Sequence, residues 1–272
     1  MKTSHLLALF PLIGSVAFGA TTASFDGGAD TPIFLNQFGD APGPSIQPID
    51  GNPGGYLELT PAINGQNNFA TFDLSDPGEN FTASTFTFQF RFDALGAGGA
   101  DGMSFNYYPT ALYGTTGGFG APLFTPEDPA AFGVLGFGFD TWGNGGLDAN
   151  ANSADYSEIS LFFDGALISR VDDTRLLPTF LDLKDGAWHT VNGAVDTAGA
   201  SVTMDVDGNP IFSNVAVAGL VPAEARVGFA GRTGGANERT SIDNVDVRFV
   251  PEPGVIGALA VGSLVLLRRR RR

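Results

Sequence analysis

Three short stretches of the sequence combine carboxylate and amide side chains with glycine in patterns that can bind a ligand. They are residues 99–102, 138–144 and 231–237. In the second stretch Asp140 and Asn144 are separated by four positions, and Asp148 follows four positions later. Their side-chain oxygens, with a backbone carbonyl near Trp142, are ligands that a hard cation such as Ca²⁺ takes. Because this spacing lets one loop surround one ion, it predicts a calcium site over residues 140–148.

The same stretches have a simpler interpretation as turns. Gly, Asn and Asp favour turns, because Gly adopts positive φ and the Asx side chains bond to nearby backbone groups. Asp101 would then be only the turn residue before a strand, and residues 231–237 only a hairpin loop. The residue types alone leave both interpretations open, with and without a bound ion.

The segments that must position these residues alternate with a period of two. Residues 85–92 place four Phe on one face and Thr, Thr, Gln and Arg on the other, as a half-buried strand does. Further strands are expected over residues 68–74, 103–108, 134–142, 158–163, 188–195, 202–206, 225–230 and 243–249. Many short strands separated by turn residues predict an all-β antiparallel sandwich in one domain, residues 24–249.

Two Gly- and Pro-rich segments, residues 27–55 and 111–130, are expected to be loops or irregular edge strands. His189 is expected to lie on a strand and to make a structural hydrogen bond. The sequence contains no cysteine, so an exported form of this domain must be held together by its core or by bound metal.

The motif residues also resemble those of a known group. The sequence is similar to concanavalin A-like domains, above all to the bacterial relatives of L-type (legume-type) lectins. The similarity lies in Ala-Asp-Gly at 100–102, Phe-Asp-Thr-Trp-Gly-Asn at 139–144, the strand start at 185–191 and the segment 227–235. The resemblance covers residues 24–249 and implies a jelly-roll sandwich that binds carbohydrate.

The resemblance also implies roles for single residues. Asp101 would accept hydrogen bonds from sugar hydroxyls, and Asn144 would contact both the sugar and the calcium ion. Gly118 or Gly120 would donate a backbone amide to the sugar, and Trp142 or Phe119 would stack on it. A loop of Thr233, Gly234 and Gly235 that runs on to Asn237 would close the pocket. The calcium ligands would be Asp140, Trp142, Asn144 and Asp148.

Two departures argue against a transition-metal ion beside the calcium. Plant members hold that ion through a Glu two residues before the calcium Asp, and this position is Gly138. A His is also expected after Asp148, and none occurs before Asp185. A calcium-only site and a site with no metal both remain consistent with the sequence.

Catalytic patterns are missing from the sequence. Retaining hydrolases of this sandwich class carry Glu-x-Asp-x-x-Glu along one strand, and no such pattern occurs. There is no Cys, and the two His of the sequence are His5 and His189. We therefore expect a binding protein rather than an enzyme.

The two ends are expected to be sorting signals. Residues 1–20 have the charged, apolar and small-residue order of a signal peptide. Pro251, Glu252 and Pro253 precede the apolar run 254–267 and five arginines, and this order resembles the PEP-CTERM signal of Gram-negative bacteria. The resemblance implies recognition by an exosortase-type enzyme, transient anchoring of residues 254–267 in the inner membrane, and delivery of the protein to the cell surface or extracellular matrix.

Removing residues 1–20 and 250–272 would remove six of 14 basic residues and one of 29 acidic residues, which leaves a net charge of −20. Such a body should repel nucleic acid and anionic lipid. The sequence thus predicts an exported, calcium-binding or metal-free lectin-like protein. The alternatives are a structural or adhesive component of a polysaccharide matrix and, third, a glycoside hydrolase.

Overall fold

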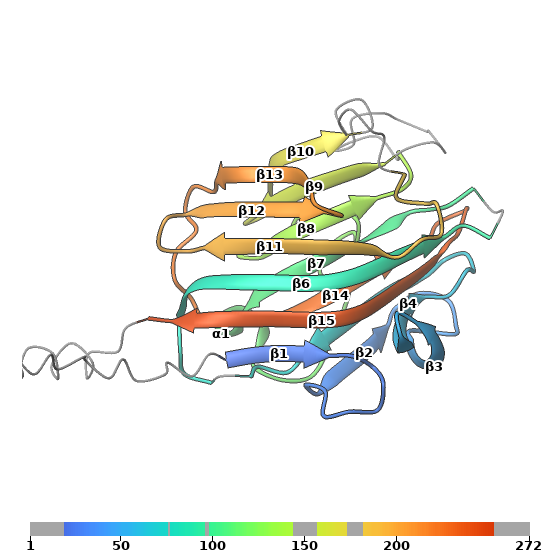
Figure 1. The fold of residues 1–272 in the computed structure, drawn as a ribbon, viewed down its shortest axis with the longest axis horizontal. Coiled ribbons are helices and arrows are strands. Elements are labelled where there is room, and N and C mark those ends of the chain that lie inside the picture. The colour runs from blue at the N-terminus through green and yellow to red at the C-terminus, as the bar shows by residue number, and fades with distance from the viewer. Residues whose placement is uncertain (1–18, 76, 96–97, 144–156, 173–181, 253–272) are drawn as a thin grey trace, which may run out of the picture.

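The protein is a sandwich of two antiparallel β-sheets (Figure 1). The computed structural model describes residues 19–75, 77–95, 98–143, 157–172 and 182–252. The eight-stranded sheet has the order β13 (Asn209–Ala216), β12 (Ser201–Val206), β11 (His189–Asp196), β6 (Phe81–Asp93), β15 (Arg239–Pro251), β4 (Gly54–Thr60) and β3 (Ser45–Gly51), with β1 (Gly19–Ala23) also paired to β15. The seven-stranded sheet has the order β10 (Ala166–Asp172), β9 (Glu158–Phe163), β8 (Leu135–Asp140), β7 (Gly102–Pro109), β14 (Ala225–Arg232), β5 (Asn67–Phe72) and β2 (Ile33–Gln37).

One short helix, α1 (Thr110–Tyr113), follows β7. Within the described ranges no helix has the length and apolar character needed to cross a membrane.

The core between the sheets is built largely from phenylalanine. β6 alternates buried Phe with polar residues, and its Phe side chains meet rings of the opposite sheet. The ring centroids of Phe86 and Phe137 lie 5.0 Å apart, and those of Phe88 and Phe229 lie 5.1 Å apart. Such aromatic pairs bury large areas and add about 0.5–1.5 kcal/mol each beyond burial.

The predicted fold class is confirmed, and each of the nine strands expected from alternation is present with its ends shifted by a few residues. Residues 27–55 contain β2 and β3, which are edge strands of the two sheets, as the Gly- and Pro-rich composition indicated. The sequence interpretation missed β4, β10 and β13. β10 and β13 are short returns after turns at Gly165 and Gly208, both at positive φ.

The sandwich extends past the boundaries expected for the two sorting signals. Gly19 and Ala20 pair with Phe249 and Arg248, so β1 begins inside the expected signal peptide. At the other end β15 continues to Pro251, which pairs with Phe81. β15 extends to Pro251 because it pairs with β6 along the whole length of β6. Residues 1–18 and 253–272, including Pro253 and the apolar run, lie outside the described residues.

The long central strand defines two ends of the molecule. β6 has 13 residues, so at ~3.3 Å per residue it spans about 40 Å. We call the end that contains Asp93, Gly102 and Arg232 the Asp101 end, on the right in Figure 1. The opposite end, where Phe81 pairs with Pro251, is called the base.

Candidate functional site

Asp101 lies where three neighbouring strands of the seven-stranded sheet end together. Gly102, the first residue of β7, pairs with Asp140 of β8 and with Arg232 of β14. The Asp101 N–H donates to the Arg232 carbonyl (3.0 Å), and the Asp101 carbonyl accepts from the Thr141 N–H (2.9 Å). The peptide bond between Ala100 and Asp101 is cis. The sheet register therefore fixes the Asp101 backbone on both sides.

The loop 233–235 lies directly against the Asp101 carboxylate. A Cβ atom on Gly234 would be 2.8 Å from Asp101 Oδ2, so any larger residue would require the carboxylate to shift. Thr233 anchors the loop, because its Oγ1 accepts from the Gln66 N–H (3.0 Å). The Gly235 carbonyl accepts from Asn64 Nδ2 (3.0 Å). The structure thus brings together four of the predicted sugar-binding residues, Asp101, Thr233, Gly234 and Gly235.

A buried ion-pair network that the sequence interpretation missed supports Asp101. Arg232 Nε lies 3.4 Å from Asp101 Oδ2 and donates to Glu127 Oε2 (3.0 Å), while a second guanidinium nitrogen contacts Glu127 Oε1. Burial raises the pKa of Glu127 to about 7, although the Arg232 charge acts in the opposite direction. Glu127 gave no sequence signal, because it lies in a segment without periodicity.

Glu238 is a second buried carboxyl group at this end. Its Oε1 accepts from Thr141 Oγ1 (2.7 Å), and Lys184 Nζ donates to the Thr141 carbonyl (3.0 Å). Glu238 Oε2 has no hydrogen-bond partner within the part of the chain that the structure describes. Burial raises the pKa of Glu238 to about 8, with the Thr141 hydrogen bond and the Lys184 charge opposing it.

This raised pKa gives a testable dependence of stability on pH. Glu238 ionises near 4.5 in the unfolded chain and near 8 in the folded chain. Between these values the folded state holds one proton more than the unfolded state, so the free energy of unfolding falls as pH rises. We expect Glu238→Gln to remove up to ~1.4 kcal/mol per pH unit of this slope in calcium-free buffer. Urea unfolding between pH 5 and 8 measures it, with the exposed Glu79→Gln as control. Identical slopes in wild type and Glu238→Gln would contradict the burial argument.

Asp140 ends β8 beside this cluster and is buried. Its Oδ1 accepts from the Trp142 N–H (2.8 Å), so the chain turns tightly after the strand. The other predicted calcium ligands, Asn144 and Asp148, lie outside the described residues. Within the described residues, no three His, Cys, Asp or Glu side chains converge as a metal site.

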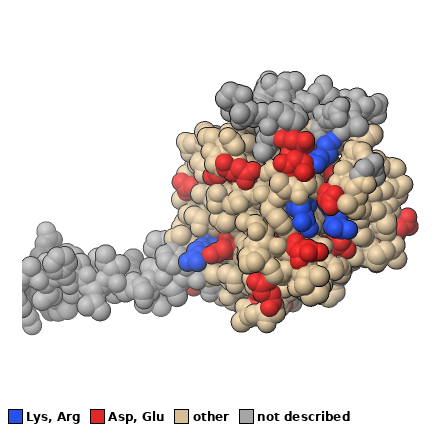
Figure 2. All heavy atoms as spheres, turned by 45° about the vertical axis from the view of Figure 1, so that its right-hand side comes forward, with Lys and Arg blue, Asp and Glu red and all other residues tan. Residues whose placement is uncertain are grey.

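Acidic and basic side chains gather together in this cluster. Carboxyl groups outnumber basic groups around Arg232 and Glu238. The members of this cluster are the acids Asp101, Glu127, Asp140 and Glu238 and the bases Lys184 and Arg232. Figure 2 turns this end toward the viewer and shows basic and acidic residues side by side rather than in separate patches.

Gly138 has no room for a side chain. A Cβ atom on Gly138 would overlap the carbonyl oxygen of Glu127 and the hydroxyl of Ser160. A glutamate at this position would have to displace the segment that carries Glu127. Gly138 is thus explained by the close approach of this segment to β8.

The structure does not bring Gly118 beside Asp101. A Cβ atom on Gly118 would overlap Asn36 of β2, whose Oδ1 also accepts from the Phe119 N–H (3.0 Å). β2 lies three strands from β7 in the sheet order, a separation of ~14 Å. Gly120 follows directly after Phe119 and has no neighbour within 4 Å of its Cβ position. These two glycines remain unsupported as sugar ligands.

The two aromatic candidates differ in their surroundings. The Phe119 ring packs against Phe69 and Tyr108, with centroid distances of 5.8 and 5.0 Å, and is therefore used in a local cluster. The Trp142 ring is partly exposed and lies 4.0 Å from the Cβ position of Gly98, close to the Asp101 loop. Trp142 is the better placed of the two for stacking on a sugar.

His189 is a structural residue, as expected. It begins β11, and its Nδ1 lies 2.7 Å from Asp207 Oδ2. Asp207 Oδ1 also accepts from the Thr190 N–H (2.8 Å). The histidine thus connects β11 to the turn after β12.

Solved structures with a similar fold include plant lectins and the VIP36 exoplasmic/lumenal domain. The Bauhinia forficata lectin in complex with GalNAc is 18% identical, with 86% of this chain and 99% of that chain covered at a TM-score of 0.58. The VIP36 exoplasmic/lumenal domain in its Ca²⁺/Man-bound form is 13% identical, with coverage of 84% and 88% and a TM-score of 0.55. The metal-free form of lectin I-B4 from Griffonia simplicifolia is 18% identical, with coverage of 84% and 98% and a TM-score of 0.55.

At these identities the similarity shows the fold, which is that of concanavalin A-like lectins. No family model matches the sequence. No curated protein matches it either.

Proposed function

We propose that the Asp101 end binds a carbohydrate without cleaving it. The observation that carries this proposal is the contact between the buried Asp101 carboxylate and the Gly234 backbone, held in place by Arg232. A fixed carboxylate accepts hydrogen bonds from neighbouring hydroxyls, and nearby backbone N–H groups donate to them. Two proteins with the same fold support this assignment, the Bauhinia forficata lectin in complex with GalNAc and the VIP36 domain in its Ca²⁺/Man-bound form.

A glycan array and a polysaccharide pull-down with the full chain test this function. We expect saturable binding to at least one glycan, and no shortening of that glycan on long incubation. Release of smaller saccharides would instead favour a glycoside hydrolase. A structural or adhesive matrix protein would show no saturable binding, while its deletion would weaken matrix cohesion.

Calcium is the ion that the site would use. Asp140, the Trp142 carbonyl, Asn144 and Asp148 would hold it, and the excess of carboxyl groups around Arg232 favours it. When bound, the ion supplies a fixed positive charge that orders its loop. The residues of the chain itself then bind the sugar, Asp101 through its carboxylate and residues 233–235 through their backbone.

Adding calcium should therefore raise thermal stability. A ligand that binds only the native state at a hundredfold excess over Kd adds ~2.7 kcal/mol. For a domain of this size, that corresponds to an increase in Tm of about 5–10 °C. Calorimetry with calcium and with chelator measures the shift, and Asp140→Asn should remove it. An unchanged wild-type Tm would contradict the calcium assignment but not sugar binding itself.

We also propose that the protein is exported and sorted to the cell surface or matrix. A leader at the N-terminus and the PEP-CTERM-like tail support this location, with an exosortase-type enzyme as partner and residues 254–267 as a transient anchor in the inner membrane. The strand β15 ends at Pro251, and the Glu252 N–H donates to the Asn80 carbonyl (2.9 Å). A cut after Glu252 would leave every strand of the sandwich intact, and mass spectrometry of the mature C-terminus tests it.

A further inference from the structure

The base contains an apolar pocket between the two sheets. Its volume is about 200 Å³, and its walls include Phe81, Tyr107, Leu135 and Phe163. The polar groups in the wall are already bonded within the protein. The Tyr107 hydroxyl lies 3.0 Å from Ser84 Oγ, and the hydroxyl of Thr197 donates to the Phe81 carbonyl (2.7 Å). The pocket therefore suits an alkyl chain and offers nothing to a polar ligand.

Exposed apolar side chains surround the mouth of this pocket. Leu112, Phe132 and Val221 are 51%, 69% and 62% exposed. Val221 and Gly133 both line the pocket, and a Cβ atom on Gly133 would be 2.7 Å from Leu112 Cδ1. Phe132 precedes Gly133, and its carbonyl accepts from the Tyr113 hydroxyl (2.7 Å). The three side chains form one apolar rim, a feature that marks interaction surfaces on soluble proteins.

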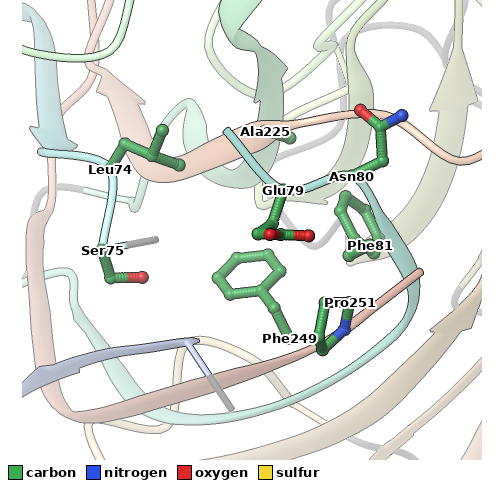
Figure 3. Close-up of a pocket in the computed structure, with 8 residues that line it drawn as sticks. All are labelled: Leu74, Ser75, Glu79, Asn80, Phe81, Ala225, Phe249 and Pro251. Atoms are coloured by element: carbon green, nitrogen blue, oxygen red, sulfur yellow. The ribbon is translucent and has the colours of Figure 1, made fainter. Parts of the chain in front are cut away.

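The chain leaves the sandwich beside this rim. Phe81 lines both the pocket and the crevice where β15 ends, and Figure 3 shows Phe81, Phe249 and Pro251 around that crevice with Glu79 among them. The apolar run 254–267 begins two residues after Glu252, and five arginines follow it. The base is thus the part of the domain next to any membrane that the tail enters.

The charges near the rim select the kind of lipid. The Asp164 carboxylate accepts from the Gly133 N–H (2.8 Å), and the Glu224 carboxylate accepts from Thr110 and Gly78. Glu79 and Glu252 lie at the neighbouring crevice. These groups are acidic, so an anionic lipid surface would be repelled and a zwitterionic one tolerated.

We propose that the base rests on a zwitterionic bilayer, with Leu112, Phe132 and Val221 among the acyl chains and the end of one acyl chain in the pocket. This inference goes beyond sugar binding and rests on the proposed membrane insertion of residues 254–267. Apolar side chains at the boundary of headgroups and acyl chains are a recognised mode of membrane contact. The Asp101 end then points away from the membrane.

Single cysteines can test this contact, because the chain has none of its own. An environment-sensitive fluorophore is attached to Phe132→Cys and to Val221→Cys in the full chain. Each labelled protein is reconstituted in phosphatidylcholine vesicles that contain nitroxide-labelled lipid, which quenches a fluorophore in contact with the bilayer. Ile49→Cys is the matched control, since Ile49 is 68% exposed. Ile49 lies on β3, whose last residue, Gly51, approaches Asp243. Asp243 pairs with Gln89 of β6, about 26 Å from Phe81 along the strand.

We expect lipid quenching at positions 132 and 221 to exceed that at position 49 by about twofold or more, and to fall in phosphatidylglycerol vesicles. Equal quenching at all three positions would overturn the proposal. Fluorescence at position 132 that is typical of an apolar environment in the absence of lipid would also overturn it, because the chain's own tail would then cover the rim. Disulfide-linked dimers of the unlabelled Phe132→Cys variant would overturn it in favour of a second copy. Glycan binding of the same labelled variants reports on the sugar site separately, so either proposal can fail alone.

Discussion

Replacing Asp101 by asparagine is expected to weaken glycan binding by about 100-fold or more. Hydrogen bonds to a charged group contribute about 1.5–3 kcal/mol each, and the proposed site has the Asp101 carboxylate accept from neighbouring sugar hydroxyls. The asparagine amide would keep one acceptor and would present N–H groups toward Arg232, which is itself a donor. Isothermal titration of wild type and Asp101→Asn against the best glycan from the array measures the difference.

Two comparisons make this result specific. Glu79→Gln removes one carboxylate from an exposed position at the base, and its glycan affinity should equal that of wild type. In Asp101→Asn, Arg232 keeps its ion pair with Glu127, so this variant should remain folded. If folded Asp101→Asn bound glycan as tightly as wild type, Asp101 would not be a sugar ligand.

Replacing Phe88 by alanine is expected to lower the free energy of unfolding by about 3–5 kcal/mol. The Phe88 ring is fully buried and meets Phe105 and Phe229 of the opposite sheet, with centroid distances of 5.1 Å in both cases. Truncation removes these contacts and leaves a cavity that close-packed strands cannot fill. Equilibrium unfolding in urea measures the loss.

The matched control is Phe132→Ala, because Phe132 has the same side chain on the surface. A substitution there should change the free energy of unfolding by less than about 0.5 kcal/mol. A small loss for Phe88→Ala would mean that the two sheets do not pack through the β6 phenylalanines. Such a result would contradict the sandwich core itself.

The strand content followed from the sequence wherever one face of a strand is buried. β6 is the clearest case, since its Phe residues alternate with polar ones along the centre of the eight-stranded sheet. The missed strands β10 and β13 lie at sheet edges, where both faces are partly exposed and the alternation is weak. The limits of the sandwich at Gly19 and Pro251 come from pairing with distant strands, which local composition does not encode.

The candidate site followed from the sequence in part. Asp101 and residues 233–235 were singled out as polar, Gly-rich stretches beside strands, and their sugar-binding roles came from the resemblance to L-type lectins. Glu127 was missed, because it reaches the site through the packing of residues 127–129 on the glycines of β8, a tertiary contact. The assignment of Gly118 relied on resemblance, and its loop instead packs against Asn36 of β2.

The central claim is that the Asp101 end is a sugar-binding site. The most direct test is competition, in which full-length protein bound to its best glycan in calcium is titrated with the free terminal sugar of that glycan. We expect saturable binding that the free sugar and a calcium chelator both release, with Asp101→Asn failing to bind. Binding that no free sugar displaces, or that Asp101→Asn retains in full, would contradict the claim.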